Sequence, residues 1–389
     1  MVFDPDGSEV DWIVGYDPPA DKFQGQIEKI LQGVDTFKSL SAVYARNPKD
    51  VAAVFKLAEK WGDRYDTAKS TEKYKEVLAL DPDGKQGTTE YGKEKVSYAQ
   101  MAEFNIGQSA LRARPPDPAP LLAFIKKYPE GVTVKDAYSR LAGIYFGRTA
   151  PKPDAAKFLE EYTTRYPQDF MAVSAWVRRI IQDKEPLDKG LELAQKAVDL
   201  AQGPMKTGAF QSLAQIYLLK GDKAKAAETV ETLIKTEEER LKSPPMTGVT
   251  MAMPTGGSGA GTATYLMTAA RIFVEADKLD RALEVFGPAF MNANLDKQGV
   301  LAGYAQFWSG QSSNLDSALI AAKKSTELTP DSYRGWSLLS QIQMKLKKYD
   351  EALKAAEKAL ELAPSQPPQI RDGIKKTIDQ IKAAMEEKK

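Results

Sequence analysis

Apolar residues recur along most of the chain at steps of three and four positions, which is the period of an amphipathic helix. The pattern starts near residue 20 and continues to the C-terminus, with short breaks at Gly, Pro, Asn and Asp. Short breaks between helices place neighbours antiparallel, so the pattern predicts an all-α chain of helical hairpins after the first residues.

The first 16 residues have a different pattern. Two apolar runs, at 1–3 and 9–14, flank the turn sequence Asp4-Pro-Asp-Gly7, which predicts a β-hairpin. An amphipathic helix is predicted at 20–32, with one apolar face made of Phe23, Ile27, Ile30 and Leu31. A lone hairpin and helix bury little surface. We therefore expect residues 1–33 to be either a cap on the following helices or the end of another domain.

The clearest helical pair covers residues 333–366. Its large and small apolar positions are Trp336, Leu339, Ala352, Ala356 and Ala359, with Pro364 ending the second helix. A shift of 34 residues towards the N-terminus places Ala302, Ala305, Ala318, Ala322 and Pro330 at equivalent positions. The two units abut without an insertion, so this spacing is a true repeat.

Further copies of the same arrangement occur at 263–295, 207–238, 171–202, 136–167 and 51–82, of which 171–202 is weaker. A degraded copy at 98–129 contains four prolines that shorten its helices. This pattern resembles the tetratricopeptide repeat (TPR) family, over about residues 35–366 and eight units, most strongly in the last four. The resemblance implies a right-handed superhelical solenoid of helical hairpins. A generic helical bundle is the alternative, but it has no reason to keep a 34-residue phase.

We expect five segments along the chain. They are the cap or remnant at 1–33, divergent repeats at 34–242, a Gly- and Met-rich loop at 243–262, TPR repeats at 263–366 and a capping helix at 367–389. The last segment carries an apolar stripe of Ile370, Ile374, Ile378, Ile381 and Met385, as the exposed end of a repeat array requires.

Residues 1–33 also resemble the closing hairpin and last helix of a thioredoxin-like domain, through Val2-Phe-Asp-Pro-Asp-Gly-Ser-Glu-Val-Asp-Trp-Ile-Val-Gly-Tyr16 and the helix that follows. In that family a Cys-x-x-Cys pair and a cis-proline lie upstream, and this chain has neither motif. No redox residue can therefore be carried over. An unrelated cap remains the alternative.

Composition narrows the chemistry. The chain has no Cys and no His, which excludes disulfides, thiolate nucleophiles, imidazole bases and the usual transition-metal sites, so we expect no metal and no cofactor. Fifty-four Lys and Arg balance 53 Asp and Glu, so charge indicates neither a nucleic-acid nor a membrane partner. The start lacks the features of a signal peptide. A soluble chain is expected, cytoplasmic as given or periplasmic if an upstream part is missing.

Three short motifs resemble parts of serine hydrolase active sites. Ser70-Thr-Glu-Lys73 and Lys206-Thr-Gly208 have the spacing of penicillin-recognising hydrolases, and Ser258 lies in a glycine-rich run. Ser70, however, occupies a small-residue position where close helix packing is expected. Ser258 lacks the second glycine of a nucleophile elbow and has no His to activate it. The chain is therefore predicted not to be an enzyme.

The resemblance to TPR proteins implies that the first helix of each repeat lines an inner groove. Its ligand-contacting positions correspond here to Gln211, Gln215, Met267, Arg271, Phe307, Gln311, Arg334, Gln341 and Lys345. Tyr304 and Leu338 stand where the family's clamp for chaperone tails has Asn, so that ligand is not expected. The residues predict a scaffold for an extended peptide or protein. The alternative is the accessory TPR region of a thioredoxin-like oxidoreductase whose redox half is absent from this chain.

Overall fold

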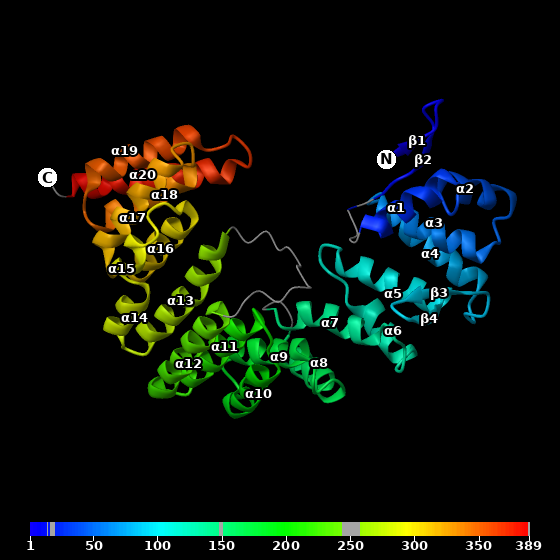
Figure 1. The fold of residues 1–389 in the computed structure, drawn as a ribbon, viewed down its shortest axis with the longest axis horizontal. Helices are drawn as coiled ribbons and strands as arrows, with labels where there is room; N and C mark the ends of the chain where they lie inside the picture. The colour runs from blue at the N-terminus through cyan, green and yellow to red at the C-terminus, as the bar shows by residue number, and fades with distance from the viewer. Residues whose placement is uncertain (14, 16–19, 148–150, 243–256, 388–389) are drawn as a thin grey trace. The chain divides into compact units, whose positions relative to one another are not determined.

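The computed structural model describes residues 1–13, 15, 20–147, 151–242 and 257–387. It is built from antiparallel helical hairpins (Figure 1), as the pattern predicted. Internal contacts divide the chain into two compact units, Met1–Arg179 and Ile180–Lys389, with the division inside one helix. Each unit is described by itself.

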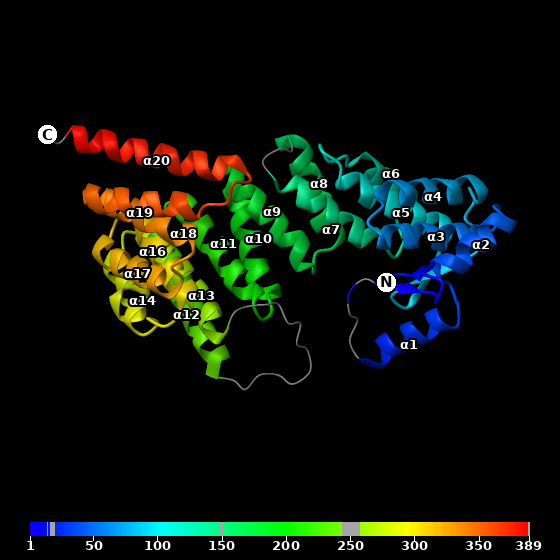
Figure 2. The same cartoon turned by 90° about the horizontal axis from the view of Figure 1, so that it is seen from above.

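Unit 1 begins with the predicted hairpin, β1 (Val2–Phe3) and β2 (Glu9–Asp11), and the predicted helix α1 (Ala20–Leu31). Figure 2 shows α1 set apart from the helices that follow. The remaining elements are α2 (Phe37–Arg46), α3 (Val51–Asp63), α4 (Thr67–Leu80), β3 (Thr88–Tyr91), β4 (Glu94–Ser97), α5 (Tyr98–Leu111), α6 (Ala119–Lys127), α7 (Val134–Tyr145), α8 (Lys152–Arg165) and most of α9 (Phe170–Asp183).

Polar side chains start several of these helices. The side chains of Thr36, Asp50 and Asp66 accept hydrogen bonds from backbone N–H groups three residues on, which fixes the first turns of α2, α3 and α4. Val54, Phe55 and Ala58 of α3 are fully buried and pack against the second helix of the pair. The apolar residues that recur at the helical period therefore form the contact between the two helices of this pair.

The antiparallel hairpin β3–β4 was not predicted. Thr88 pairs with Ser97 and Tyr91 with Glu94 around a turn at Gly92, whose φ of +64° suits glycine. Val96 is 2% exposed, whereas Glu90, Glu94 and Lys95 point outwards. A half-buried strand this short has only a weak alternation of apolar and polar residues, which is hard to recognise in the sequence between two helical patterns.

Unit 2 contains α10 (Leu187–Leu200), α11 (Met205–Leu219), α12 (Lys223–Lys242), α13 (Gly257–Glu275), α14 (Leu279–Phe286), α15 (Pro288–Asn292), α16 (Gln298–Gln311), α17 (Leu315–Leu328), α18 (Tyr333–Lys345), α19 (Tyr349–Leu362) and α20 (Pro368–Glu386). The first helices of successive pairs touch in turn, α11 with α13, α13 with α16 and α16 with α18. The second helices pack outside them. This layering is the arrangement expected for stacked hairpins.

Two boundaries in unit 2 differ from the prediction. The loop was predicted at 243–262, and its residues 243–256 lie outside the described residues. Its last residues, 257–262, are helical and form the start of α13. The second helix of the next pair is broken at Gly287-Pro288, since proline lacks the N–H that would continue α14. Ala289, which follows the break in α15, is exposed.

The isoleucine stripe of α20 packs as predicted. Ile374, Ile378 and Ile381 are buried against the alanines of α19. Among the helices of the described part, none has the length and apolar character needed to cross a membrane.

The largest buried side chain of unit 2 provides a test of its core. Trp308 is 0% exposed, and its Nε1 donates a hydrogen bond of 2.8 Å to the Phe286 carbonyl. We expect Trp308→Ala to lower the free energy of unfolding by about 3–5 kcal/mol, because it leaves a cavity and an unpaired carbonyl. Urea unfolding of the full chain measures this loss. Ile320→Ala, at a position 53% exposed in α17, is the control and should change stability by less than about 0.5 kcal/mol.

Candidate functional site

The catalytic serine hypothesis can be examined in α4. Ser70 is 6% exposed, and its Oγ donates a hydrogen bond of 2.8 Å to the Ala58 carbonyl of α3. Lys73 Nζ instead lies 2.7 Å from Glu76 Oε2 and 3.8 Å above the Tyr44 ring. Partial burial lowers the pKa of Lys73, but hydrogen bonds to Glu76 and Tyr44 outweigh it and raise the pKa above its usual value. Lys73 therefore stays protonated, and Ser70 serves helix packing as predicted.

The predicted groove residues all lie on the first helices of unit 2. Three are exposed, namely Arg334, Gln341 and Lys345. Five are half-buried, namely Gln211, Gln215, Met267, Arg271 and Gln311. The contacts of α11 with α13, α13 with α16 and α16 with α18 bring these helices into one layer, which we call the first-helix surface.

Phe307 does not belong to this surface. It is only 9% exposed, and its ring centroid lies 5.4 Å from Phe286 and 4.8 Å from Trp308. The break after α14 brings Phe286 within reach of α16, so Phe307 packs into the core. Its prediction as a groove contact is wrong, because an aromatic residue suits a core as well as it suits a groove.

Lys345 and Arg334 have local partners. Lys345 Nζ donates to the Ser309 carbonyl and to Ser312 Oγ, which lies 3.2 Å away. A cation at the last carbonyls of a helix stabilises that end, so Lys345 ties α18 to the C-terminus of α16. Arg334 Nε lies 3.2 Å from the hydroxyl of neighbouring Tyr333 and remains exposed.

Arg271 differs from the other residues of the surface. Its Nε is buried and has no hydrogen-bond partner among the residues that the structure describes. A buried guanidinium N–H without an acceptor is costly, and an added carboxylate or carbonyl oxygen satisfies it. Met267 lies one turn earlier on the same helix and adds apolar surface. This position is the best candidate for a ligand contact on the first-helix surface.

A cavity that was not predicted from the sequence lies in unit 1. A cavity of about 500 Å³ opens between α3 and the N-terminal segment. The α3 side supplies Lys56, Glu59, Lys60 and Asp63, and the opposite side is lined by Asp11, Trp12, Ile13, Gln26, Lys29, Ile30, Val34 and Asp35. The four α3 residues lie at helical spacing on one face, a signal that could have been read from the sequence. The approach of Asp11 and Trp12 to that face could not.

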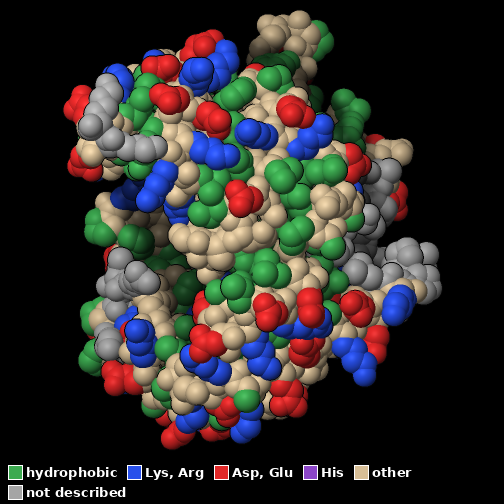
Figure 3. Space-filling view, turned by 90° about the vertical axis from the view of Figure 1, so that its left-hand side faces the viewer, with side chains coloured by type: hydrophobic (Ala, Val, Ile, Leu, Met, Phe, Trp, Pro, Cys, Tyr) green, Lys and Arg blue, Asp and Glu red, His purple; other side chains and the backbone are tan. Residues whose placement is uncertain are grey.

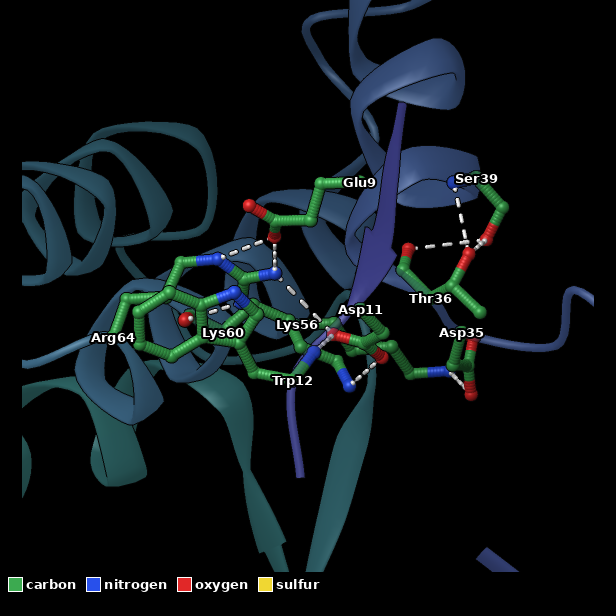
Figure 4. Close-up of polar contacts among 9 residues, drawn as sticks. All are labelled: Glu9, Asp11, Trp12, Asp35, Thr36, Ser39, Lys56, Lys60 and Arg64. Carbon is green, nitrogen blue, oxygen red and sulfur yellow. Dashed lines mark hydrogen bonds and ion pairs between the residues drawn. The ribbon is translucent and has the colours of Figure 1, made fainter. Parts of the chain in front are cut away.

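An ion-pair network joins the two sides of this cavity (Figure 4). Asp11 is 0% exposed, and its two carboxylate oxygens accept from Lys60 and from Arg64. Arg64 also donates to Glu9 through Nε at 3.0 Å, and its guanidinium lies 4.0 Å from the centre of the Phe37 ring. A planar guanidinium can satisfy several acceptors and stack at once, so Arg64 is the centre of the network.

Two other carboxylates, those of Glu59 and Asp63, line the same cavity. Burial raises the pKa of Glu59 to about 7, and the charge of Asp63 adds to the rise. Burial likewise raises the pKa of Asp63.

The charged side chains on the face seen in Figure 3 are of both signs and are intermixed, so that face has no large patch of one sign.

Comparison with known protein families identifies one of these helical hairpins. The family model for the tetratricopeptide repeat matches residues 333–366, which comprise α18, α19 and the residues that follow them. Residues 333–366 form a tetratricopeptide repeat. This TPR unit is the one in which the sequence spacing was clearest. No curated protein matches this chain significantly in sequence.

Several solved TPR structures are similar to the chain. A tetratricopeptide repeat protein from Parabacteroides merdae has 12% identity and a TM-score of 0.41, covering 79% of this chain and 98% of its own. Yeast Tom70 has 13% identity and a TM-score of 0.43, covering 94% and 87%. YrrB, described as a TPR protein with an unusual peptide-binding site, has 14% identity and a TM-score of 0.29, covering 56% and 97%.

The raised pKa of Glu59 provides a test of the cavity in unit 1. Because the Asp63 charge contributes to it, Asp63→Asn should lower the pKa of Glu59 from about 7 towards its ordinary value. The carboxyl carbon shift of Glu59, followed by NMR across a pH titration, reports the midpoint. Asp83→Asn, at an exposed residue after α4, is the control. An unchanged midpoint in Asp63→Asn would show that the two carboxylates do not interact.

Proposed function

We propose that the chain is a non-enzymatic interaction scaffold that binds an extended peptide or protein segment along the first-helix surface of unit 2. The observation that carries the proposal is the buried Nε of Arg271, which has no hydrogen-bond partner within the described part of the chain. The continuous contact of α11, α13, α16 and α18 supports it, because an extended ligand needs a surface that runs across several repeats. The TPR match at residues 333–366 adds that the array contains a repeat of an interaction family.

The residues of this surface favour a peptide with acidic character. Arg271 and Arg334 supply positive charge, and an Arg pairs with a carboxylate through two parallel hydrogen bonds. Gln211, Gln215 and Gln341 offer amide groups, which can donate to and accept from a peptide backbone. Lys345 is excluded from the ligand contacts, since its ammonium already serves the α16 terminus.

Removing the Arg271 guanidinium tests the proposal directly. Peptides selected by display against the full chain should be enriched in Asp and Glu, and Arg271→Gln should weaken their binding by about 10-fold or more. Isothermal titration measures the affinity. Lys354→Gln, at an exposed position of the second helix α19, is the matched control and should bind unchanged. Equal affinity for Arg271→Gln and the wild type would remove Arg271 from the site.

A double change at exposed positions extends this test. Arg334→Glu with Gln341→Glu reverses the local charge without touching the Lys345 tie, and it should further reduce binding of acidic peptides. The circular dichroism melt should stay unchanged, because both side chains are exposed.

The second candidate function is that of the accessory TPR region of a thioredoxin-like oxidoreductase. The order of β1, β2 and α1 favours it, because the resemblance implies a hairpin followed by a helix. Reading the DNA upstream of Met1 tests it. An in-frame Cys-x-x-Cys would support this candidate, and an in-frame stop codon directly before Met1 would count against it.

A further inference from the structure

The divergent pair made of α5 and α6 is irregular at the turn between its helices. Three residues separate α3 from α4, whereas seven, 112–118, separate α5 from α6. Pro115, Pro116 and Pro118 lie in this stretch and delay the start of the second helix, because a proline disfavours helical geometry at the residue before it. As a result α6 has 9 residues, against 14 in α4 and 14 in α8, and is about 7.5 Å shorter than either.

An open cavity of about 810 Å³ lies where α6 starts late, wholly within unit 1. One side is formed by residues 67–75 in the N-terminal half of α4. The other is formed by residues 106–113 at the C-terminal end of α5, together with Pro120 of α6. We call this cavity the α4–α5 groove. Its volume is in the range of cavities that hold ligands.

The interior of the α4–α5 groove is largely apolar. Ala68, Ile106, Ala110, Ala113 and Pro120 contribute to it. Ile106 is partly exposed there and also packs against the buried core of α3, α4 and α5. The small alanine side chains leave space above it, so a large apolar side chain from another molecule would gain free energy by leaving water and filling this space.

Two cations also line the groove, Lys75 of α4 and Arg112 directly after α5. Both are exposed, and neither side chain forms an ion pair or hydrogen bond with another residue that the structure describes. The other two lysines of α4, Lys69 and Lys73, both pair with nearby carboxylates. Glu72 is the one acid among the lining residues, so the cations outnumber it. Cations without partners beside an apolar interior favour an occupant that carries a carboxylate.

An exposed aromatic residue lies next to the groove in the sequence. Tyr65 precedes Thr67, the first lining residue, by two positions, and it is 78% exposed. Its φ of +58° is in the left-handed region, which a bulky residue adopts at a cost. At the same place in three hairpins of unit 2 the left-handed residue is Gly221, Asp277 or Lys347. A tyrosine at this turn offers apolar area and a hydroxyl to a protein partner.

From these observations we propose that the α4–α5 groove is a docking site for a short segment of a partner protein that carries a large apolar side chain beside a carboxylate. The apolar side chain fills the space beside Ile106 and Ala110, and the carboxylate pairs with Lys75 and Arg112. This site goes beyond the proposed peptide surface, because it lies in unit 1 and uses a second helix, α4, as one of its sides.

Peptide display tests the docking site. The bait is the full chain with Arg271→Gln and Arg334→Glu, so that peptides for the first-helix surface of unit 2 do not dominate the selection. Selected peptides should share a large apolar residue beside Asp or Glu. Their affinity for the bait is then measured by isothermal titration. Because the bait lacks the arginines of unit 2, failure here leaves the proposed function untouched, and the reverse also holds.

Two changes in the groove should each weaken binding of these peptides by at least about 10-fold. Lys75→Glu with Arg112→Glu reverses the charge at two exposed positions, and Ala68→Trp fills the groove from an exposed position of α4. Lys49→Glu with Lys126→Glu is the matched control, since it changes the net charge equally at exposed positions outside the groove. The control should change the affinity by less than about twofold.

A thiol reporter locates the bound peptide. The chain has no cysteine, so Ser109→Cys places a single thiol in the groove, and Ala123→Cys places one at an exposed position of α6 outside it. At a peptide concentration of about ten times Kd, iodoacetamide should alkylate the Ser109→Cys thiol about 10-fold more slowly than without peptide. Alkylation of the Ala123→Cys thiol should keep its rate.

Four results would overturn the proposal. The first is a selection that enriches no peptide, and the second is binding that only one or neither of the two groove changes weakens. The third is equal weakening by the control, which would show that net charge and not the groove is responsible. The fourth is self-association of the chain that Ala68→Trp abolishes, measured by sedimentation, because the occupant would then be a second copy.

Discussion

The close approach of two helices through small side chains is the contact on which the array depends. Ala352, Ala356 and Ala359 of α19 are buried, in a cluster that includes residues of both α18 and α20. Gly107 makes the same point in unit 1, since an added Cβ would lie 2.7 Å from the Leu121 side chain. Buried hydroxyls strengthen such crossings, as where Ser340 Oγ donates a hydrogen bond of 2.9 Å to the Ala352 carbonyl. Large side chains are then left to fill the space between hairpins.

Because large apolar side chains point between hairpins, no hairpin can bury all of its apolar surface by itself. Each pair leaves an apolar side that the next pair must cover, and the last pair is covered by α20 through Ile374, Ile378 and Ile381. Cations add ties between neighbouring pairs. Lys345 binds the end of α16 in unit 2, and in unit 1 Arg179 donates to the carbonyls of Tyr145 and Gly147 at the end of α7. The array therefore combines apolar stacking with caps on helix ends.

The two candidate surfaces differ because their helices have different neighbours. On the first-helix surface of unit 2, Arg271 has a buried donor with no acceptor among the residues that the structure describes, which is the basis for proposing an acidic ligand there. On α3 of unit 1, the carboxylates of Glu59 and Asp63 line the cavity beside the N-terminal segment. Packing constrains the buried positions of each helix and leaves the other side chains free to vary.

The helical class, the pairing of helices, the packing role of Ser70 and the N-terminal hairpin followed clearly from the sequence, because each depends on a local period or turn. Other features depended on residues distant in the chain. Phe307 is a core residue because its ring packs against Phe286, a residue of another helix pair. Hairpin β3–β4 formed against α5, where its weak alternation gained a surface to bury Val96. The network around Asp11 joins residues more than 45 positions apart, between Asp11 and Lys60 and between Glu9 and Arg64. The sequence by itself therefore determined the repeating unit, and only the tertiary structure decided which charged side chains meet, because such pairs have no period from which they can be read.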